Sequence, residues 1–241
     1  MNSFQLQTKT KKSLMTPITI AIDGFSSTGK STLAKQLAKH LGYIFVDSGA
    51  MYRAITLFAL QNGYISNNFF DKDSLINSLP AIKLHFEFNA DLGYAEIFLN
   101  NKNVEQEIRT IEVSNFVSKI AEISEIRAKL VEQQQQMGKN KGIVMDGRDI
   151  GTVVFPDAEL KIFMNASTPV KAKRRFDELS QKGQKVSFDE VLKNVQERDY
   201  IDTHRTDSPL IKATDAIEID NSNLTREEQF DIVLSLVNKL K

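Results

Sequence analysis

One eight-residue stretch constrains the fold more than any other feature of this 241-residue chain. It reads Gly24-Phe25-Ser26-Ser27-Thr28-Gly29-Lys30-Ser31 and matches the pattern G-x-x-x-x-G-K-[ST] at every fixed position. In this pattern the glycines let the backbone wrap a phosphate, and N–H groups at the start of the next helix bind the anion. Lys30 is expected to reach the β and γ oxygens, and the Ser31 hydroxyl to help hold Mg²⁺. The stretch predicts a nucleoside triphosphate site; the alternative is a plain Gly/Ser turn.

The order of elements around this stretch predicts an α/β fold. A short β-branched strand is expected over 18–23 and an amphipathic helix over 31–41. A second strand and helix are expected over 43–46 and 50–61. This β-α-β-α order predicts a parallel sheet with helices on its faces.

The second half of the chain continues the same alternation. Strands are expected at 142–145, 160–164 and 216–219, and helical residues over 111–137 in one or two pieces. Three further helices are expected to begin at N-caps. These caps are Thr168 followed by proline, Ser187 in a capping box, and Thr225 in a similar pattern.

The pattern changes between about 66 and 108. Residues 66–80 are polar and are expected to be irregular. The segments 84–88 and 95–99 alternate in period two, and polar residues separate them, which predicts a hairpin. We interpret 66–108 as a small β-containing subdomain inserted into a core formed by 15–65 and 109–241.

Composition excludes several classes of protein. Lys and Arg number 31 and so do Asp and Glu, whereas a protein that binds nucleic acid mainly by charge is expected to be basic. The absence of Cys excludes disulfides and thiolate metal sites. The sequence shows neither an apolar run of about 18 residues nor a secretory signal. We expect a cytoplasmic protein without membrane or nucleic-acid partners, with residues 1–14 as a disordered arm or with translation starting at Met15.

Arginine occupies positions where a helix should be apolar. The apolar face of the helix after Ser187 passes through Val195 and continues, by heptads, into Arg198, Asp202 and Arg205. In the 111–137 stretch, Arg127 falls on an apolar stripe in the same way. Because an inward charge is costly unless it is paired, two such helices predict a shared polar cleft. The alternative is a solvated helix end with Asp202 bridging its arginine neighbours.

Asp146-Gly147-Arg148-Asp149 follows a predicted strand, at the edge of the sheet where α/β proteins bind ligands. Asp146 is a candidate acid that serves Mg²⁺ through water, and Arg148 a candidate ligand of a phosphoryl group; the alternative is a tight turn with a surface ion pair. Arg53 lies one turn into its predicted helix, and Arg174 and Arg175 lie on a basic helix. With them, seven of the nine arginines are candidate site residues: Arg53, Arg127, Arg148, Arg174, Arg175, Arg198 and Arg205. So many guanidinium groups suit a site for two phosphorylated molecules.

No histidine triad or metal spacing is present, and no N-K-x-D motif supports a guanine site. A phosphate monoester acceptor needs no catalytic base, because its second pKa is about 6 and its oxygen is ionised at neutral pH. A site that is rich in arginine and lacks a catalytic base therefore predicts phosphoryl transfer to a nucleoside monophosphate.

The residues from Ile18 to about Leu240 resemble the bacterial-type cytidylate kinases, a family of P-loop nucleoside monophosphate kinases. The motifs that carry the resemblance are IAIDGFSSTGKST, VDSGAMYRA, EIRTIEVS, MDGRDIGTVVFPDA and ERDYIDTHR. It implies a three-layer P-loop core, a monophosphate-binding insert and a helical lid over about 168–206. It also implies transfer of the ATP γ-phosphate to CMP or dCMP with Mg²⁺. Phe25 and Ser31 stand where members often have Pro and Gly, so direct Mg²⁺ ligation by Ser31 stays open.

The resemblance also implies roles for single residues. ATP phosphates would be bound by Gly24, Phe25, Ser26, Ser27, Thr28, Gly29, Lys30, Ser31 and Thr32. The acceptor phosphate would be held by Ser48, Arg53 and Arg148, beside Asp146. Cytosine would be faced by Ser118, Arg127, Asp149 and Arg205, with Arg198 and Asp202 near the ribose. The moving phosphoryl would be stabilised by Lys30, Arg148, Arg174 and Arg175.

Two rival hypotheses stay open at this point. One is a kinase of the same fold with another acceptor, such as UMP, AMP or shikimate. The other is a non-enzymatic nucleotide-sensing or RNA-binding module, to which the Lys-rich residues 1–14 would contribute. The chain is expected to be a monomer.

Overall fold

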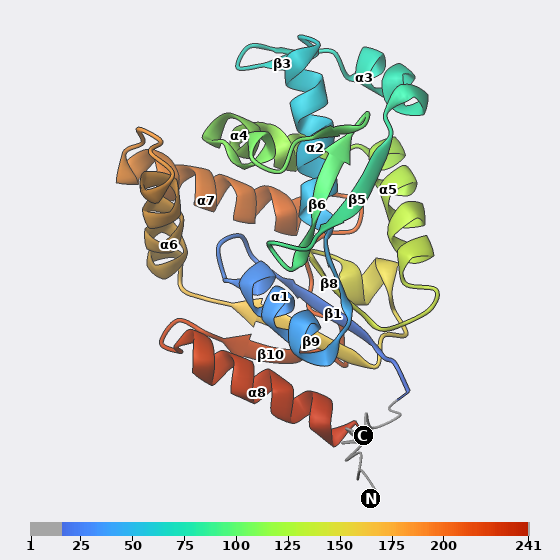
Figure 1. Ribbon diagram of the computed structural model, residues 1–241. Helices are drawn as coiled ribbons and strands as arrows, with labels where there is room; N and C mark the ends of the chain where they lie inside the picture. Colours follow the sequence, from blue (N-terminus) through green and yellow to red (C-terminus); the bar gives the residue numbers. More distant parts are fainter. Residues whose placement is uncertain (1–15, 241) are drawn as a thin grey trace, which may run out of the picture.

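The computed structural model describes residues 16–240, and a five-stranded sheet lies at its centre (Figure 1). The strand order is β10-β9-β1-β8-β2, and every neighbouring pair is parallel. The strands are β1 (Thr19–Gly24), β2 (Ile44–Asp47), β8 (Ile143–Gly147), β9 (Leu160–Asn165) and β10 (Ile217–Asp220). The parallel sheet confirms the α/β prediction, while the predicted arm over 1–14 lies outside the described residues.

Helices cover both faces of the sheet. Ile20 and Ile22 of β1 pack with α1 (Lys30–Leu41) and α8 (Arg226–Lys239) in one cluster. Ala21, which alternates with them, faces the opposite side, where residues of α5 (Ser124–Met137) pack. Because successive side chains of a strand point to opposite faces, a short apolar strand such as β1 fills two cores at once. The expected three layers are confirmed.

Eight short elements lie between α2 (Ser48–Gln61) and α4 (Ile111–Ile120), in the region that the sequence predicts to be an insert. The 84–99 hairpin is confirmed and gains a third strand. The expectation of irregular structure at 66–80 was wrong, because a seven-residue helix begins there after Asp71, whose side chain accepts a hydrogen bond from the Ser74 N–H at 2.9 Å. Only Leu75 of that helix is buried, so the sequence shows no apolar repeat. The elements are β3 (Ile65–Ser66), β4 (Phe69–Phe70), α3 (Lys72–Ser78), η1 (Leu79–Ala81), β5 (Leu84–Asn89), β6 (Tyr94–Leu99), β7 (Lys102–Asn103) and η2 (Glu107–Arg109).

The remaining helices surround the carboxyl end of the sheet. The 111–137 stretch is two helices, as allowed for, and the apolar residues of the insert share one core with them and with α2. The capping boxes at Ser187 and Thr225 are confirmed, but the N-cap of α6 is Ser167 rather than Thr168. These helices are α2 (Ser48–Gln61), α4 (Ile111–Ile120), α6 (Thr168–Gln181) and α7 (Phe188–His204), with a short π-helical turn, η3 (Ile150–Val154), after β8.

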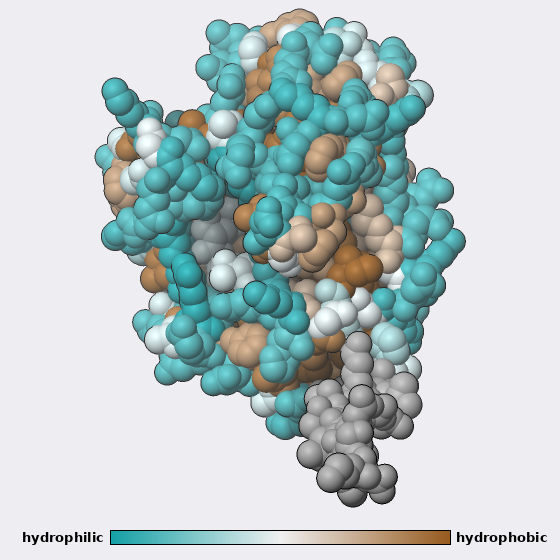
Figure 2. Space-filling view, viewed as in Figure 1, coloured by the Kyte–Doolittle hydropathy of each residue, from teal (hydrophilic) through white to brown (hydrophobic). Residues whose placement is uncertain are grey.

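Among residues 16–240, no helix is long and apolar enough to cross a bilayer. Hydrophilic side chains cover most of the face shown in Figure 2, and a hollow lies beside α6 and α7.

Candidate active site

A cavity of about 320 Å³ lies where β1, β2 and β8 end, bounded by helices from both halves of the chain. Parallel strands place their carboxyl ends at one edge, so the loops that follow them meet there. Seven arginines line the cavity: Arg53, Arg109, Arg127, Arg148, Arg175, Arg198 and Arg205. Five acidic residues lie among them: Asp47, Asp146, Asp149, Glu178 and Asp202. The predicted polar cleft between the two helical stretches is therefore present.

The glycine-rich loop enters the cavity from β1. Gly24 has a φ of +142°, and a Cβ there would lie 2.0 Å from the Met164 carbonyl oxygen, so only glycine lets β1 pass β9 at this point. Six of the nine predicted loop residues line the cavity: Ser26, Ser27, Gly29, Lys30, Ser31 and Thr32. The other three support the loop. The Phe25 ring packs edge-on against Phe163, and the buried Thr28 hydroxyl donates to the Phe25 carbonyl oxygen at 3.0 Å.

Lys30 is turned back onto this loop. Its Nζ donates to the Phe25 carbonyl oxygen at 2.5 Å and lies 3.4 Å from the Thr28 hydroxyl. Burial, together with the positive charge of Arg148, lowers the pKa of Lys30 to about 7. An anion bound in the loop would favour the charged ammonium and so raise the pKa of Lys30 again. Lys30 is therefore placed where a bound phosphate would keep it charged.

Ser31 and Asp146 meet across the sheet edge. The Ser31 hydroxyl donates to Asp146 Oδ2 at 2.8 Å, and Asp146 Oδ1 is buried with no hydrogen-bond partner among the described residues. Burial and the neighbouring charge of Asp47 raise the pKa of Asp146 to about 7. A carboxylate oxygen left without a donor in a polar cavity fits a hydrated cation.

Residues at the start of α2 form another part of the cavity wall. The Ser48 hydroxyl donates to the Asp146 backbone oxygen at 2.8 Å, and Arg53 donates to Asp47 at 2.8 Å. Burial alone would raise the pKa of Asp47, but the guanidinium groups of Arg53 and Arg109 outweigh it and hold that pKa at about 2. The Asp47 carboxylate also accepts from the Ala50 N–H and so begins the helix.

Two buried ion pairs also line the cavity. Arg127 pairs with Asp149, and its guanidinium donates to the Ala121 carbonyl oxygen at 3.0 Å. Arg148 donates to Asp202 at 2.7 Å, and Ser118 donates to the other oxygen of Asp202 at 3.3 Å. These contacts reject the alternative of a solvated helix end, since Arg127 and Asp202 are almost fully buried.

Arg198 and Arg205 add positive charge that is matched only in part, because Asp202 lies 3.9 Å from Arg205 and already pairs with Arg148. Arg198 donates to the Ser114 hydroxyl at 3.1 Å, and burial together with Arg148 lowers its pKa. Arg205 donates to the Ser208 carbonyl oxygen at 2.8 Å, and burial together with Arg127 lowers its pKa. Guanidinium groups in such surroundings favour an anionic ligand.

The two arginines of α6 are placed differently from each other. Arg175 lines the cavity and pairs with Glu178 at 2.9 Å. Arg174 is not among the lining residues; its guanidinium donates to the side chain and backbone oxygens of Asn221 at 3.0 and 2.9 Å. Asn221 in turn donates to the Thr28 carbonyl oxygen at 2.6 Å, so Arg174 supports the glycine-rich loop in this conformation.

Several residues that line the cavity were not predicted from the sequence, among them Arg109, Asp47 and Tyr52. Arg109 was one of two arginines left without a role, although the scarcity of arginine in this chain marks each one. Asp47 immediately follows the apolar part of β2, which is the position that drew attention to Asp146 after β8. The sequence does not mark Tyr52 as a site residue, because tyrosines on buried helix faces are common in protein cores. The Tyr52 hydroxyl has no hydrogen-bond partner among residues 16–240.

Comparison with known proteins agrees with this geometry. The sequence profile described as cytidylate kinase matches residues 20–239. The cytidylate kinase of Flavobacterium psychrophilum is 74% identical over 226 residues, which are 94% of this chain and 100% of the relative. Those of Flavobacterium johnsoniae and Bacteroides thetaiotaomicron are 71% and 56% identical, over 93% and 89% of this chain and 97% and 94% of each relative. A glycine-rich loop facing an arginine-lined cavity, and similarity over almost the whole chain, lead to one conclusion: the chain belongs to the cytidylate kinase family.

Proposed function

We propose that this protein transfers the γ-phosphoryl group of ATP to CMP and dCMP. The observation that carries the proposal is one cavity that is lined both by the glycine-rich loop and by arginines paired with acids. Two nucleotides that meet end to end in it would place donor and acceptor oxygens in line. Positioning and charge stabilisation then supply most of the catalysis, because phosphoryl transfer requires little covalent chemistry from the protein.

The donor side is residues 24–32. Backbone N–H groups around Gly29 would bind the phosphates, and Lys30 would move from the Phe25 carbonyl oxygen to the β and γ oxygens. Gly29 supports this role, because with a φ of +90° it begins α1 without a side-chain cap and leaves the first N–H groups of the helix available.

Ser31 and Asp146 would hold Mg²⁺, Ser31 directly or through water. The fit rests on the orphaned Oδ1 of Asp146 and on its contact with the Ser31 hydroxyl. No group of three or more His, Cys or acidic side chains within the described part of the chain is arranged around a metal. Mg²⁺ does not need one, since it is commonly bound by one or two carboxylates, water and substrate phosphates. When bound, the ion supplies neutralising charge to the phosphates.

The acceptor phosphate would lie between the start of α2 and the residues after β8. Ser48, Arg53 and Arg148 would hold it, with Arg53 and Arg148 already oriented by Asp47 and Asp202. The phosphate monoester is ionised at neutral pH, so the attacking oxygen needs no base.

The base of the acceptor nucleotide would be recognised by four residues of the cavity: Ser118, Arg127, Asp149 and Arg205. Cytosine presents an amino donor beside two acceptors, which a carboxylate and a guanidinium complement. Uracil would place an oxygen against Asp149 and would donate no hydrogen bond to the carboxylate. Arg198 and Asp202 would lie near the ribose.

Two mobile parts would enclose the substrates. We propose residues 168–206, which include α6 and α7, as a lid, and 66–108 as the monophosphate-binding insert. On closure Arg175 and Arg174 would join Lys30 and Arg148 around the moving phosphoryl group. Such closure excludes water, which would otherwise accept the phosphoryl group.

An ADP-release assay tests the proposal. ATP and Mg²⁺ are held constant while CMP, dCMP, UMP, AMP and shikimate are offered in turn, with Lys30→Met as the inactive control. Rapid ADP release with CMP and dCMP, and at least tenfold less with the others, is the expected result. Equal rates with UMP or AMP would contradict the acceptor assignment. ATP binding without ADP release would favour a nucleotide-sensing module instead.

A further inference from the structure

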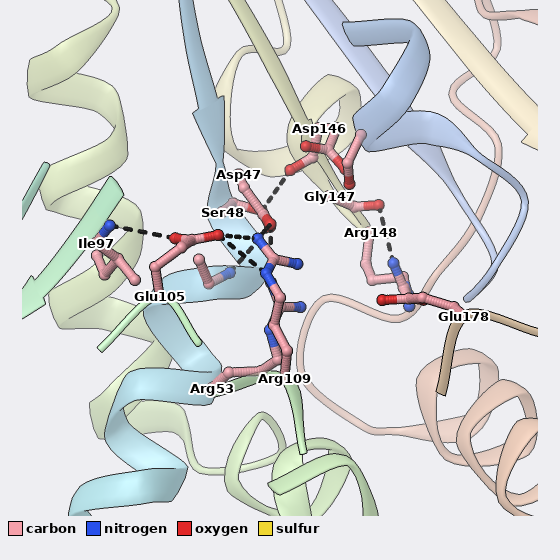
Figure 3. A network of polar contacts seen from close by, with 12 residues as sticks. Asp47, Ser48, Arg53, Ile97, Glu105, Arg109, Asp146, Gly147, Arg148 and Glu178 are labelled. Atoms are coloured by element: carbon pink, nitrogen blue, oxygen red, sulfur yellow. Dashed lines mark hydrogen bonds and ion pairs between the residues drawn. The ribbon is translucent and has the colours of Figure 1, made fainter. Parts of the chain in front are cut away.

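Glu105 lies outside the cavity yet is joined to it by a chain of polar contacts (Figure 3). The residue follows β7 and precedes η2, and it is 4% exposed. One carboxylate oxygen accepts from Arg109 through Nε at 2.9 Å and through Nη2. The other accepts from the backbone N–H of Ile97 in β6 at 3.3 Å. Both oxygens of this buried acid are therefore occupied.

Arg109 continues the chain into the cavity. Its Nη2 lies 3.5 Å from Asp47 Oδ2, and the same oxygen accepts from Arg53 at 2.8 Å. Asp47, Arg53 and Arg109 line the cavity, whereas Glu105 does not. Of the side-chain contacts of Glu105, those with Arg109 lead toward the cavity, and Arg109 shares Asp47 with Arg53.

We propose that Glu105 is a positioning residue for acceptor binding, which sets Arg109 and through it the Asp47–Arg53 pair. The proposal rests on the proposed function, in which Arg53 binds the acceptor phosphate. Two guanidinium groups compete for one Asp47 oxygen, and Glu105 supplies the second carboxylate that keeps them apart. A planar guanidinium bound at both Nε and Nη2 is fixed in orientation as well as in place.

The contact with Ile97 also connects Glu105 to the strand β6. Ile97 is in the middle strand of the insert, and Asp47 begins α2. Glu105 and Arg109 therefore tie the insert sheet to the wall on which the acceptor phosphate would rest. None of the contacts in this chain reaches the glycine-rich loop, so the effect should fall on the monophosphate and spare ATP.

The test compares Glu105→Gln with Glu107→Gln. Glutamine keeps the size of the side chain and removes its charge, so Arg109 loses its charge-assisted contacts. We expect the KM for CMP to rise about tenfold in Glu105→Gln, while the KM for ATP stays within about twofold. Glu107 is the matched control, since it stands two residues away, is 40% exposed and pairs with Lys102 on the surface at 2.7 Å. Its variant should keep both KM values.

Arg109→Lys keeps the proposal testable should Glu105→Gln fold poorly, because lysine retains the charge and loses the fork. If the two residues act together, the double variant should raise the KM for CMP no more than Arg109→Lys alone. A KM for CMP within twofold of wild type in Glu105→Gln would overturn the proposal, as would an equal rise of both KM values. A wild-type enzyme that does not phosphorylate CMP would instead overturn the proposed function.

Discussion

Asp202→Asn should be the most destabilising single-charge change in the cavity. Asp202 is buried, accepts from Arg148 at 2.7 Å and lies 3.9 Å from Arg205. Burial alone would raise the pKa of Asp202, but Arg148, Arg198 and Arg205 outweigh it and lower that pKa. Asparagine keeps the shape of the side chain but leaves these guanidinium groups without a counter-charge.

The magnitude follows from the geometry. Two unit charges 4 Å apart interact by about 4 kcal/mol at an effective dielectric constant of 20. Removal of one partner from a buried pair costs about 3–5 kcal/mol, because the other charge stays desolvated. We expect the free energy of unfolding to fall by about 3–5 kcal/mol, which for a chain of this size lowers Tm by roughly 10 °C.

Urea unfolding at neutral pH measures this loss, with Asp177→Asn as the control. Asp177 pairs with Lys173 on the surface of α6, and its side chain is 44% exposed. Its replacement should change the free energy of unfolding by less than about 0.5 kcal/mol. Pyrophosphate should stabilise Asp202→Asn more than wild type, since an anion replaces the lost counter-charge. A loss under about 1 kcal/mol, or one equal to that of Asp177→Asn, would refute the reasoning.

Three further predictions concern specificity, the unpaired hydroxyl and acid stability. Asp149→Asn should relax discrimination against UMP, because the amide no longer repels the uracil oxygen; steady-state rates with CMP and UMP measure it, and an unchanged ratio removes Asp149 from base recognition. Tyr52→Phe should leave Tm within about 1 °C but weaken CMP binding in calorimetry about threefold, since Tyr52 lines the cavity and its buried hydroxyl has no partner among residues 16–240; unchanged affinity would show that the hydroxyl does not contact the ligand. The folded-state pKa of Asp47, about 2, lies below its ordinary value of 3.8, so this residue stabilises the fold above pH 3.8 and loses that contribution as the pH falls toward 2. Between pH 5 and pH 3 the wild type should lose about 1 kcal/mol that Asp47→Asn does not lose, and parallel urea titrations of the two would contradict this.

Local patterns predicted most of the fold. β1 follows from a run of 6 residues and α1 from a run of 12, and the motif between them needs no distant partner. The hairpin at 84–99 and the capping boxes are equally local. The failures were local too: α3 is too short and polar for periodicity to reveal it, and the cap of α6 was misplaced by one residue.

Periodicity also found which arginines point inward, but not which acids they meet. Arg127 and Arg198 interrupt apolar stripes, so the cost of an unpaired buried charge predicted a polar cleft. Arg109 was not predicted, because it lies in a single turn, η2, which is too short to have an apolar stripe that a charge could interrupt.

The sequence by itself determined the phosphate-binding loop, the parallel α/β class and the inward direction of the charged helix faces, because each depends on neighbours within a few residues. The tertiary structure alone decided the pairing of those charges. Arg148, which follows β8, meets Asp202 of α7 across 54 positions, and Arg109 of η2 meets Asp47 at the end of β2 across 62. The helical period predicts on which face of its helix a side chain lies. The residue that it meets there depends on how elements distant in the sequence pack against that face.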